Sequence, residues 1–131
     1  MADHQERFNL ARNNFARAVT RLQEVLAIAE DDIVRDSLIQ RFEFTYELGW
    51  KAMFYWLRDQ GERVPETGRM VLQAAFKAEL IENADLWERI KDFRNETSHT
   101  YDAEKAKQVA IFVRAEAADA FRQLRDKLIS L

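Results

Sequence analysis

Apolar residues recur at steps of three and four along most of this 131-residue chain, which is the spacing of one face of an α-helix. The clearest stripe follows Asp102, a residue suited to cap a helix, and a similar stripe runs from Phe8 to Ala29. Only three Gly and one Pro are present, too few turn-forming residues for the tight reversals of a β-sandwich or β-barrel. The sequence therefore predicts an all-α fold.

A second helix is predicted from about Ile33 to Gln60, roughly 40 Å long at about 1.5 Å per residue. Its aromatic side chains point around more than half of the circumference, so we expect it at the centre of its own bundle or against another chain. Core or dimer packing explains this aromatic belt more simply than base stacking does. Gly49 within it is either a tolerated helix-weakening residue or the point where the backbone of a neighbouring helix approaches closely.

Two shorter helices are expected before the final one. Thr67 can cap a third helix, and a fourth follows from about Asn83. With the last helix starting after Asp102, the count is five, joined by short connections. This pattern predicts an up-and-down helical bundle that forms a single domain over residues 1–131.

Composition narrows the chemistry that the chain can perform. There is no Cys, which excludes disulfides and thiolate metal sites and agrees with a reducing cytoplasm. No apolar stretch approaches the roughly 20 residues of a membrane helix, and no signal peptide is visible, so we expect a cytoplasmic protein with no membrane partner. Lys and Arg number 20 against 23 Asp and Glu, so a nucleic-acid partner must be held by a local patch. Neither a metal nor a cofactor is indicated.

The best catalytic candidates lie in the segment from Lys91 to Asp102. The chain has two histidines, and His4 lies in a terminal stretch where fraying is expected, which leaves His99. In an unbroken helix, Arg94 and His99 would point about 140° apart. If the fourth helix ends between Asn95 and Ser98, where polar residues weaken it, the chain can turn and bring guanidinium and imidazole to one site.

Two motifs carry a resemblance to a known family. Arg94-Asn-Glu-Thr-Ser-His99-Thr-Tyr101 resembles the R-x4-H-x-Y motif of HEPN-domain proteins, specifically the HepT-like toxins. Gln40-Arg-Phe-Glu-Phe-Thr-Tyr-Glu-Leu-Gly-Trp-Lys51 is similar to the signature of small proteins long labelled nucleotidyltransferase substrate-binding subunits, which belong to the same group. The resemblance spans nearly the whole chain.

The resemblance implies a homodimeric, metal-independent endoribonuclease, the toxin of a toxin–antitoxin pair, whose two motifs meet across the subunit interface. Arg94 would hold the RNA phosphate, and His99 would move protons between the ribose and the leaving oxygen. Asn95 would orient His99 or a phosphate oxygen, and Lys91, one turn before Arg94, would add RNA-binding charge. An MntA-like antitoxin, a minimal nucleotidyltransferase, would transfer AMP to Tyr101 and so obstruct the cleft.

Other interpretations remain open. Arg94 could be a helix C-terminal cation, His99 a turn residue and Tyr101 half-buried packing. Glu43 and Glu47 could form a metal or general-acid pair, although an Arg or Lys from a neighbouring helix or subunit is the more natural partner. The alternative function is that of a non-catalytic substrate-binding subunit of a two-component nucleotidyltransferase, which should tolerate the loss of His99.

Overall fold

The computed structural model describes the backbone of residues 2–131 and the side chains of residues 5–131, so the side chain of His4 lies outside the described part. Within this part the regular elements are all helical: α1 (Ala2–Leu26), α2 (Asp32–Asp59), α3 (Gly68–Lys77), α4 (Ala84–Glu96), η1 (Thr97–His99), α5 (Ala103–Phe112), η2 (Val113–Ala117) and α6 (Ala118–Ser130). Of these helices, none in the described part has both the length and the apolarity needed to cross a membrane. The predicted all-α fold is confirmed.

The last three elements form one continuous rod. Val113 and Ala118, at the two junctions, keep α-helical backbone angles. Counted this way, residues 2–131 form five helices, as the sequence predicts, together with the short 3-10 turn η1. The π-helical stretch η2 was not predicted, because the apolar steps of three and four continue through it.

Helix starts are where the sequence places them, because local capping groups decide them. The Thr67 hydroxyl accepts a hydrogen bond from the Met70 amide at 3.3 Å, and Asn83 accepts one from the Leu86 amide at 3.0 Å. The Asp102 carboxylate accepts from the Glu104 amide at 2.8 Å. Each satisfies a backbone N–H that has no partner within its own helix.

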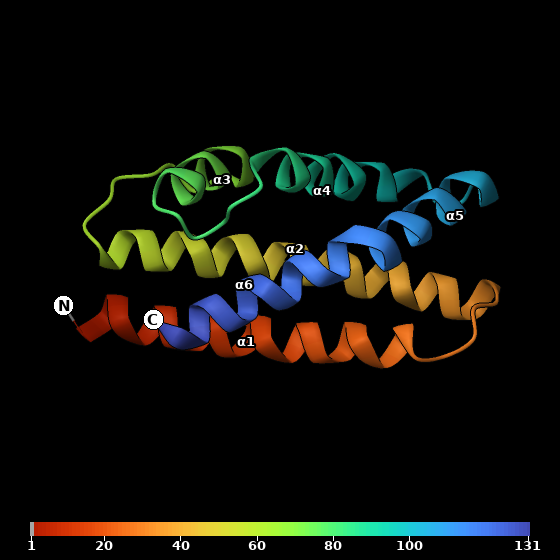
Figure 1. Ribbon diagram of the computed structural model, residues 1–131, viewed down its shortest axis with the longest axis horizontal. Helices are drawn as coiled ribbons and strands as arrows, with labels where there is room; N and C mark the ends of the chain where they lie inside the picture. Colours follow the sequence, from red (N-terminus) through yellow and green to blue (C-terminus); the bar gives the residue numbers. More distant parts are fainter. Residues whose placement is uncertain (1) are drawn as a thin grey trace.

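The 28-residue α2 is the central helix of the bundle. It packs along α1 and also contacts α3, α4, α5 and α6. Figure 1 shows α2 between α1 on one side and α3 with α4 on the other, with the C-terminal rod crossing over it. The prediction that this helix is buried on more than one side is therefore confirmed, and its own bundle supplies the cover.

An aromatic cluster joins four helices in the core. The ring of Phe121 on α6 lies 6.3 Å from Phe15 of α1, 6.0 Å from Phe42 of α2 and 5.7 Å from Trp87 of α4, between ring centroids. Gly49 lies beside this cluster, where an added Cβ would be 2.9 Å from Cε1 of Phe15. The space beside Gly49 is therefore filled by a side chain of the neighbouring helix α1, the ring of Phe15, and not by the backbone of that helix as the sharper interpretation expects.

Candidate active site

Helix α4 ends at Glu96, and the 3-10 turn η1 carries the chain from Thr97 to His99. Side-chain hydroxyls donate hydrogen bonds to backbone carbonyls at this end of the helix. Thr97 donates to the Arg94 carbonyl at 2.6 Å, and Ser98 donates to the Asn95 carbonyl at 3.2 Å. Serine and threonine compete with the helix for its own backbone acceptors in this way. The predicted end of the fourth helix, between Asn95 and Ser98, is confirmed.

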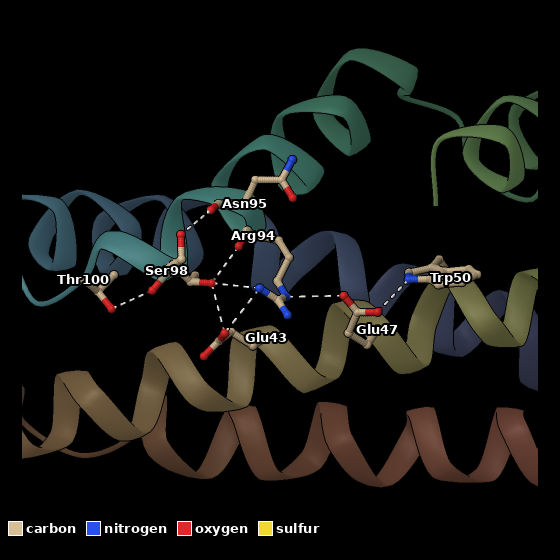
Figure 2. Close-up of polar contacts among 8 residues, drawn as sticks. Glu43, Glu47, Trp50, Arg94, Asn95, Ser98 and Thr100 are labelled. Atoms are coloured by element: carbon tan, nitrogen blue, oxygen red, sulfur yellow. Dashed lines mark hydrogen bonds and ion pairs between the residues drawn. The ribbon is translucent and has the colours of Figure 1, made fainter. Parts of the chain in front are cut away.

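Arg94 is the hub of the polar contacts in Figure 2. Its Nη1 donates to the Thr97 hydroxyl at 3.0 Å and lies 3.3 Å from Oε2 of Glu43. Its Nε lies 3.4 Å from Oε1 of Glu47, within ion-pair distance although outside hydrogen-bonding geometry. No hydrogen bond among the described residues uses the remaining nitrogen, Nη2. Three side chains therefore hold the guanidinium, and Nη2 is the nitrogen left for another acceptor.

The two glutamates of α2 pair with an arginine of a neighbouring helix, the kind of partner that the sequence favours. Glu43 and Glu47 both face Arg94 from the neighbouring helix α4, as predicted for an acidic pair one turn apart. Oε2 of Glu43 also lies 3.0 Å from the Thr97 hydroxyl, whose single proton can go either to Glu43 or to the Arg94 carbonyl, and Glu47 accepts a hydrogen bond from the Trp50 indole at 3.0 Å. No cluster of three or more metal-ligating side chains occurs in the part whose side chains are described.

His99 and Tyr101 lie beyond the end of α4 on the outside of the bundle. His99 is exposed, Tyr101 is 88% exposed, and their ring centroids are 6.4 Å apart in an edge-on arrangement. This exposure contradicts the interpretation of Tyr101 as packing. Within the described part of one chain, Arg94 has polar contacts with Thr97, Glu43 and Glu47 but none with His99. Their convergence on one phosphodiester stays a prediction.

Lys91 and Asn95 join Arg94 at the edge of an open pocket of about 290 Å³ between α2, α3 and α4. Lys91 is tied to its own helix, with Nζ 3.1 Å from Glu88 and 3.5 Å from Asp92. The hydrogen bond with Glu88 raises the pKa of Lys91 above its ordinary value, so the side chain stays cationic.

Arg69, at the start of α3, is a further basic residue of this pocket, and the sequence analysis missed it. The only sequence signal is its position two residues after the helix cap Thr67. That position does not reveal that the start of α3 lines the same pocket as Lys91, Arg94 and Asn95 of α4.

Comparisons with known proteins are consistent with one another. Residues 10–130 match the family described as nucleotidyltransferase substrate binding protein like. A protein of Haemophilus influenzae named "Probable ribonuclease HepT" is 39% identical over 88 residues. That match spans 61% of this chain and 60% of the relative, so the chain matches about three fifths of the relative's length.

Solved structures share the fold. A protein of Thermus thermophilus is 29% identical, with a TM-score of 0.73 over 88% of this chain and 96% of its own. One chain of a mutant MntA–HepT toxin–antitoxin structure has a TM-score of 0.78 over 96% of this chain and 99% of its own. At 19% identity, the second likeness concerns the fold alone.

Proposed function

Because this chain belongs to the nucleotidyltransferase substrate-binding-like family, as the resemblance in its sequence indicates, we propose that it is a HepT-like toxin, a metal-independent endoribonuclease paired with an MntA-like antitoxin. The similarity to a probable ribonuclease HepT supports this proposal. The observation that carries it is the guanidinium of Arg94 on α4, fixed by three side chains with Nη2 uncommitted, together with the exposed His99 in the 3-10 turn that follows this helix.

The residue types suit cleavage of RNA without a metal. An arginine held in a fixed orientation can bind a phosphate oxygen and stabilise the negative charge that builds on it in the transition state. An imidazole gives and takes protons near neutral pH. In the proposed step, His99 takes the proton of the ribose 2′-OH, the 2′-oxygen attacks phosphorus, and the bond to the 5′-oxygen breaks. The leaving oxygen takes a proton from a second imidazole.

That second imidazole is the reason for proposing a homodimer. One chain supplies one exposed histidine at this corner, and a two-fold axis beside η1 would place His99 of each subunit across the same cleft. Asn95 would orient His99 or a phosphate oxygen, and Lys91 would add positive charge. This charge would be local, because the protein as a whole carries a formal net charge of −3.

Tyr101 is the proposed site of silencing by the partner nucleotidyltransferase. The Tyr101 residue is 88% exposed, so an enzyme can reach its hydroxyl group. Attack of the tyrosine oxygen on the α-phosphorus of ATP would form Tyr–AMP and release pyrophosphate. The bulky anionic adduct, two residues from His99, would block the cleft and repel RNA. Tyr101→Phe should leave cleavage intact but abolish silencing by partner and ATP, measured by RNA cleavage and by the mass of the protein.

The central experiment measures RNA cleavage by purified protein, wild type against His99→Ala, with and without the partner nucleotidyltransferase and ATP. His4→Ala removes the other histidine of the chain and serves as the matched control. We expect His99→Ala to lose cleavage by a hundredfold or more, about the contribution of a general acid–base group, while His4→Ala keeps it. Full cleavage by His99→Ala would refute the proposal.

The alternative is a non-catalytic subunit that presents a substrate to a nucleotidyltransferase. The observation that favours it is the basic pocket between α2, α3 and α4, whose lining includes Arg69 and Arg94 but not His99. This function predicts that the His99→Ala protein still supports the partner's transfer reaction and that the wild type leaves RNA intact.

A further inference from the structure

The pocket between α2, α3 and α4 combines positive charge with an aromatic wall. Its lining includes three basic side chains, Arg69, Lys91 and Arg94, and a single carboxylate, Glu47. Trp50 and Tyr46 form the aromatic part of the wall. Its volume of about 290 Å³ lies near the lower end of the usual range for small-ligand sites. The pocket is therefore suited to a small anionic ligand that also offers a flat ring.

The three basic side chains differ in how strongly they are engaged. Lys91 and Arg94 are mostly covered, with 20% and 30% of their side chains exposed, and acidic neighbours hold them in place. Arg69 is exposed and has no ion-pair partner among the residues whose side chains are described. It can therefore turn toward an anion in the pocket without first losing a carboxylate.

Trp50 is held in a fixed position. Its Nε1 donates to Oε2 of Glu47 at 3.0 Å, while the other oxygen of the same carboxylate lies 3.4 Å from Nε of Arg94 (Figure 2). One carboxylate thus sets the position of both the aromatic ring and the guanidinium. A nucleobase of any kind can stack on such a ring, because every base has a flat π-face.

The wall formed by α3 is closely fitted against α2. A Cβ added at Gly68 would lie 2.8 Å from the Tyr46 hydroxyl oxygen, so only glycine lets the start of α3 approach Tyr46 this closely. Burial raises the pKa of Tyr46, and the negative charge of Glu47 adds to this effect, so the phenol stays neutral. The pocket therefore does not carry a second negative charge from Tyr46.

We propose that this pocket binds one nucleotide unit, with its phosphate on Arg69 and Nη2 of Arg94 and its base against Trp50. The nucleotide can belong to single-stranded RNA or be free in solution, since both offer the same phosphate and base. In the proposed ribonuclease Arg94 holds the scissile phosphate, so the identification of the bound phosphate with the scissile one rests on the proposed function. The binding itself does not depend on cleavage, because no residue of η1 takes part in it.

The test measures binding in a His99→Ala background, so that RNA stays whole. A fluorescently labelled single-stranded RNA hexamer and, separately, AMP are titrated into the protein, and Arg69→Ala is compared with Arg7→Ala. Arg7 is an exposed arginine on α1, on the far side of α2 from α3 and α4 (Figure 1). Far-UV circular dichroism checks that each variant is folded.

We expect Arg69→Ala to weaken binding about tenfold, as the loss of one charge-assisted hydrogen bond does, and Arg7→Ala to change it less than twofold. For the hexamer, the slope of log K against log salt should fall by about 0.7 with the loss of one phosphate contact. Trp50→Leu should weaken binding at least fivefold, whereas Trp50→Phe, which keeps an aromatic ring, should retain most of it.

The outcomes separate this proposal from the proposed function. Equal effects of Arg69→Ala and Arg7→Ala, or binding of neither ligand, would overturn the pocket proposal whether or not the wild type cuts RNA. Arg69-dependent binding by a protein that does not cut RNA would support the pocket and refute the ribonuclease. If AMP binds as tightly as the hexamer, a free nucleotide is the natural ligand; if only the hexamer binds, the ligand is RNA.

Discussion

Replacing Thr97 by Val would remove one hydroxyl group from the support of Arg94 and leave the shape of the side chain nearly unchanged. The Thr97 residue is 6% exposed. Its oxygen accepts from Nη1 of Arg94 at 3.0 Å and lies 3.0 Å from Oε2 of Glu43 and 2.6 Å from the Arg94 carbonyl oxygen. With a single hydroxyl proton, it can donate to one of these two acceptors at a time.

The expected cost follows from these contacts. A hydrogen bond to a charged group contributes roughly 1.5–3 kcal/mol. The side chains of Arg94 and Glu43 are 30% and 34% exposed, so water can replace part of what they lose, and the lower end of that range applies. Because valine fills nearly the same volume, little is added for a cavity. We expect Thr97→Val to lower the free energy of unfolding by about 1.5 kcal/mol.

Urea unfolding followed by far-UV circular dichroism measures this change, with Thr20→Val as the matched control. The Thr20 hydroxyl is exposed and bonds only to the Ala16 carbonyl of its own helix at 3.2 Å. Its replacement should change the free energy of unfolding by less than about 0.5 kcal/mol. RNA cleavage should fall about tenfold or more in Thr97→Val, because the guanidinium is less firmly positioned. Equal stability of the two variants, with cleavage unchanged, would refute the role assigned to Thr97.

Two further predictions concern packing and pH. Gly49→Ala should lower the free energy of unfolding, measured in urea, by about 1–2 kcal/mol. Alanine has the better helix propensity, but its new Cβ meets the fully buried ring of Phe15. A variant as stable as the wild type would contradict this close contact. For Glu30, burial acts to raise the pKa, but hydrogen bonds from Arg114 and Arg35 outweigh it and lower the pKa below its ordinary value of 4.5. This carboxylate therefore adds stability at neutral pH that is lost as pH falls through the lowered pKa. Between about pH 5 and about pH 3, the urea midpoint of the wild type should fall more than that of Glu30→Gln, and parallel midpoints would refute the linkage.

The π-helical stretch η2 shows where a sequence pattern stops being informative. It directs two side chains toward different neighbours: Arg114 bonds to Glu30 at 2.9 Å and to the Leu26 carbonyl at 3.0 Å, near the α1–α2 connection. Glu116 pairs with Arg89 of α4. A π-bulge inserts an extra residue into a turn while the apolar steps continue around it, so only the backbone reveals it.

The sequence by itself determined the five helices, their approximate ends and the burial of α2 on more than one side, because apolar spacing and capping act between residues three or four positions apart. Its motifs also indicated the family. Only the tertiary structure decided what surrounds Arg94: Thr97 and Glu43 are 54 positions apart in the chain, and Arg69 reaches the same pocket from a third helix. Such contacts depend on how helices pack against one another, and no local pattern in the sequence encodes that geometry.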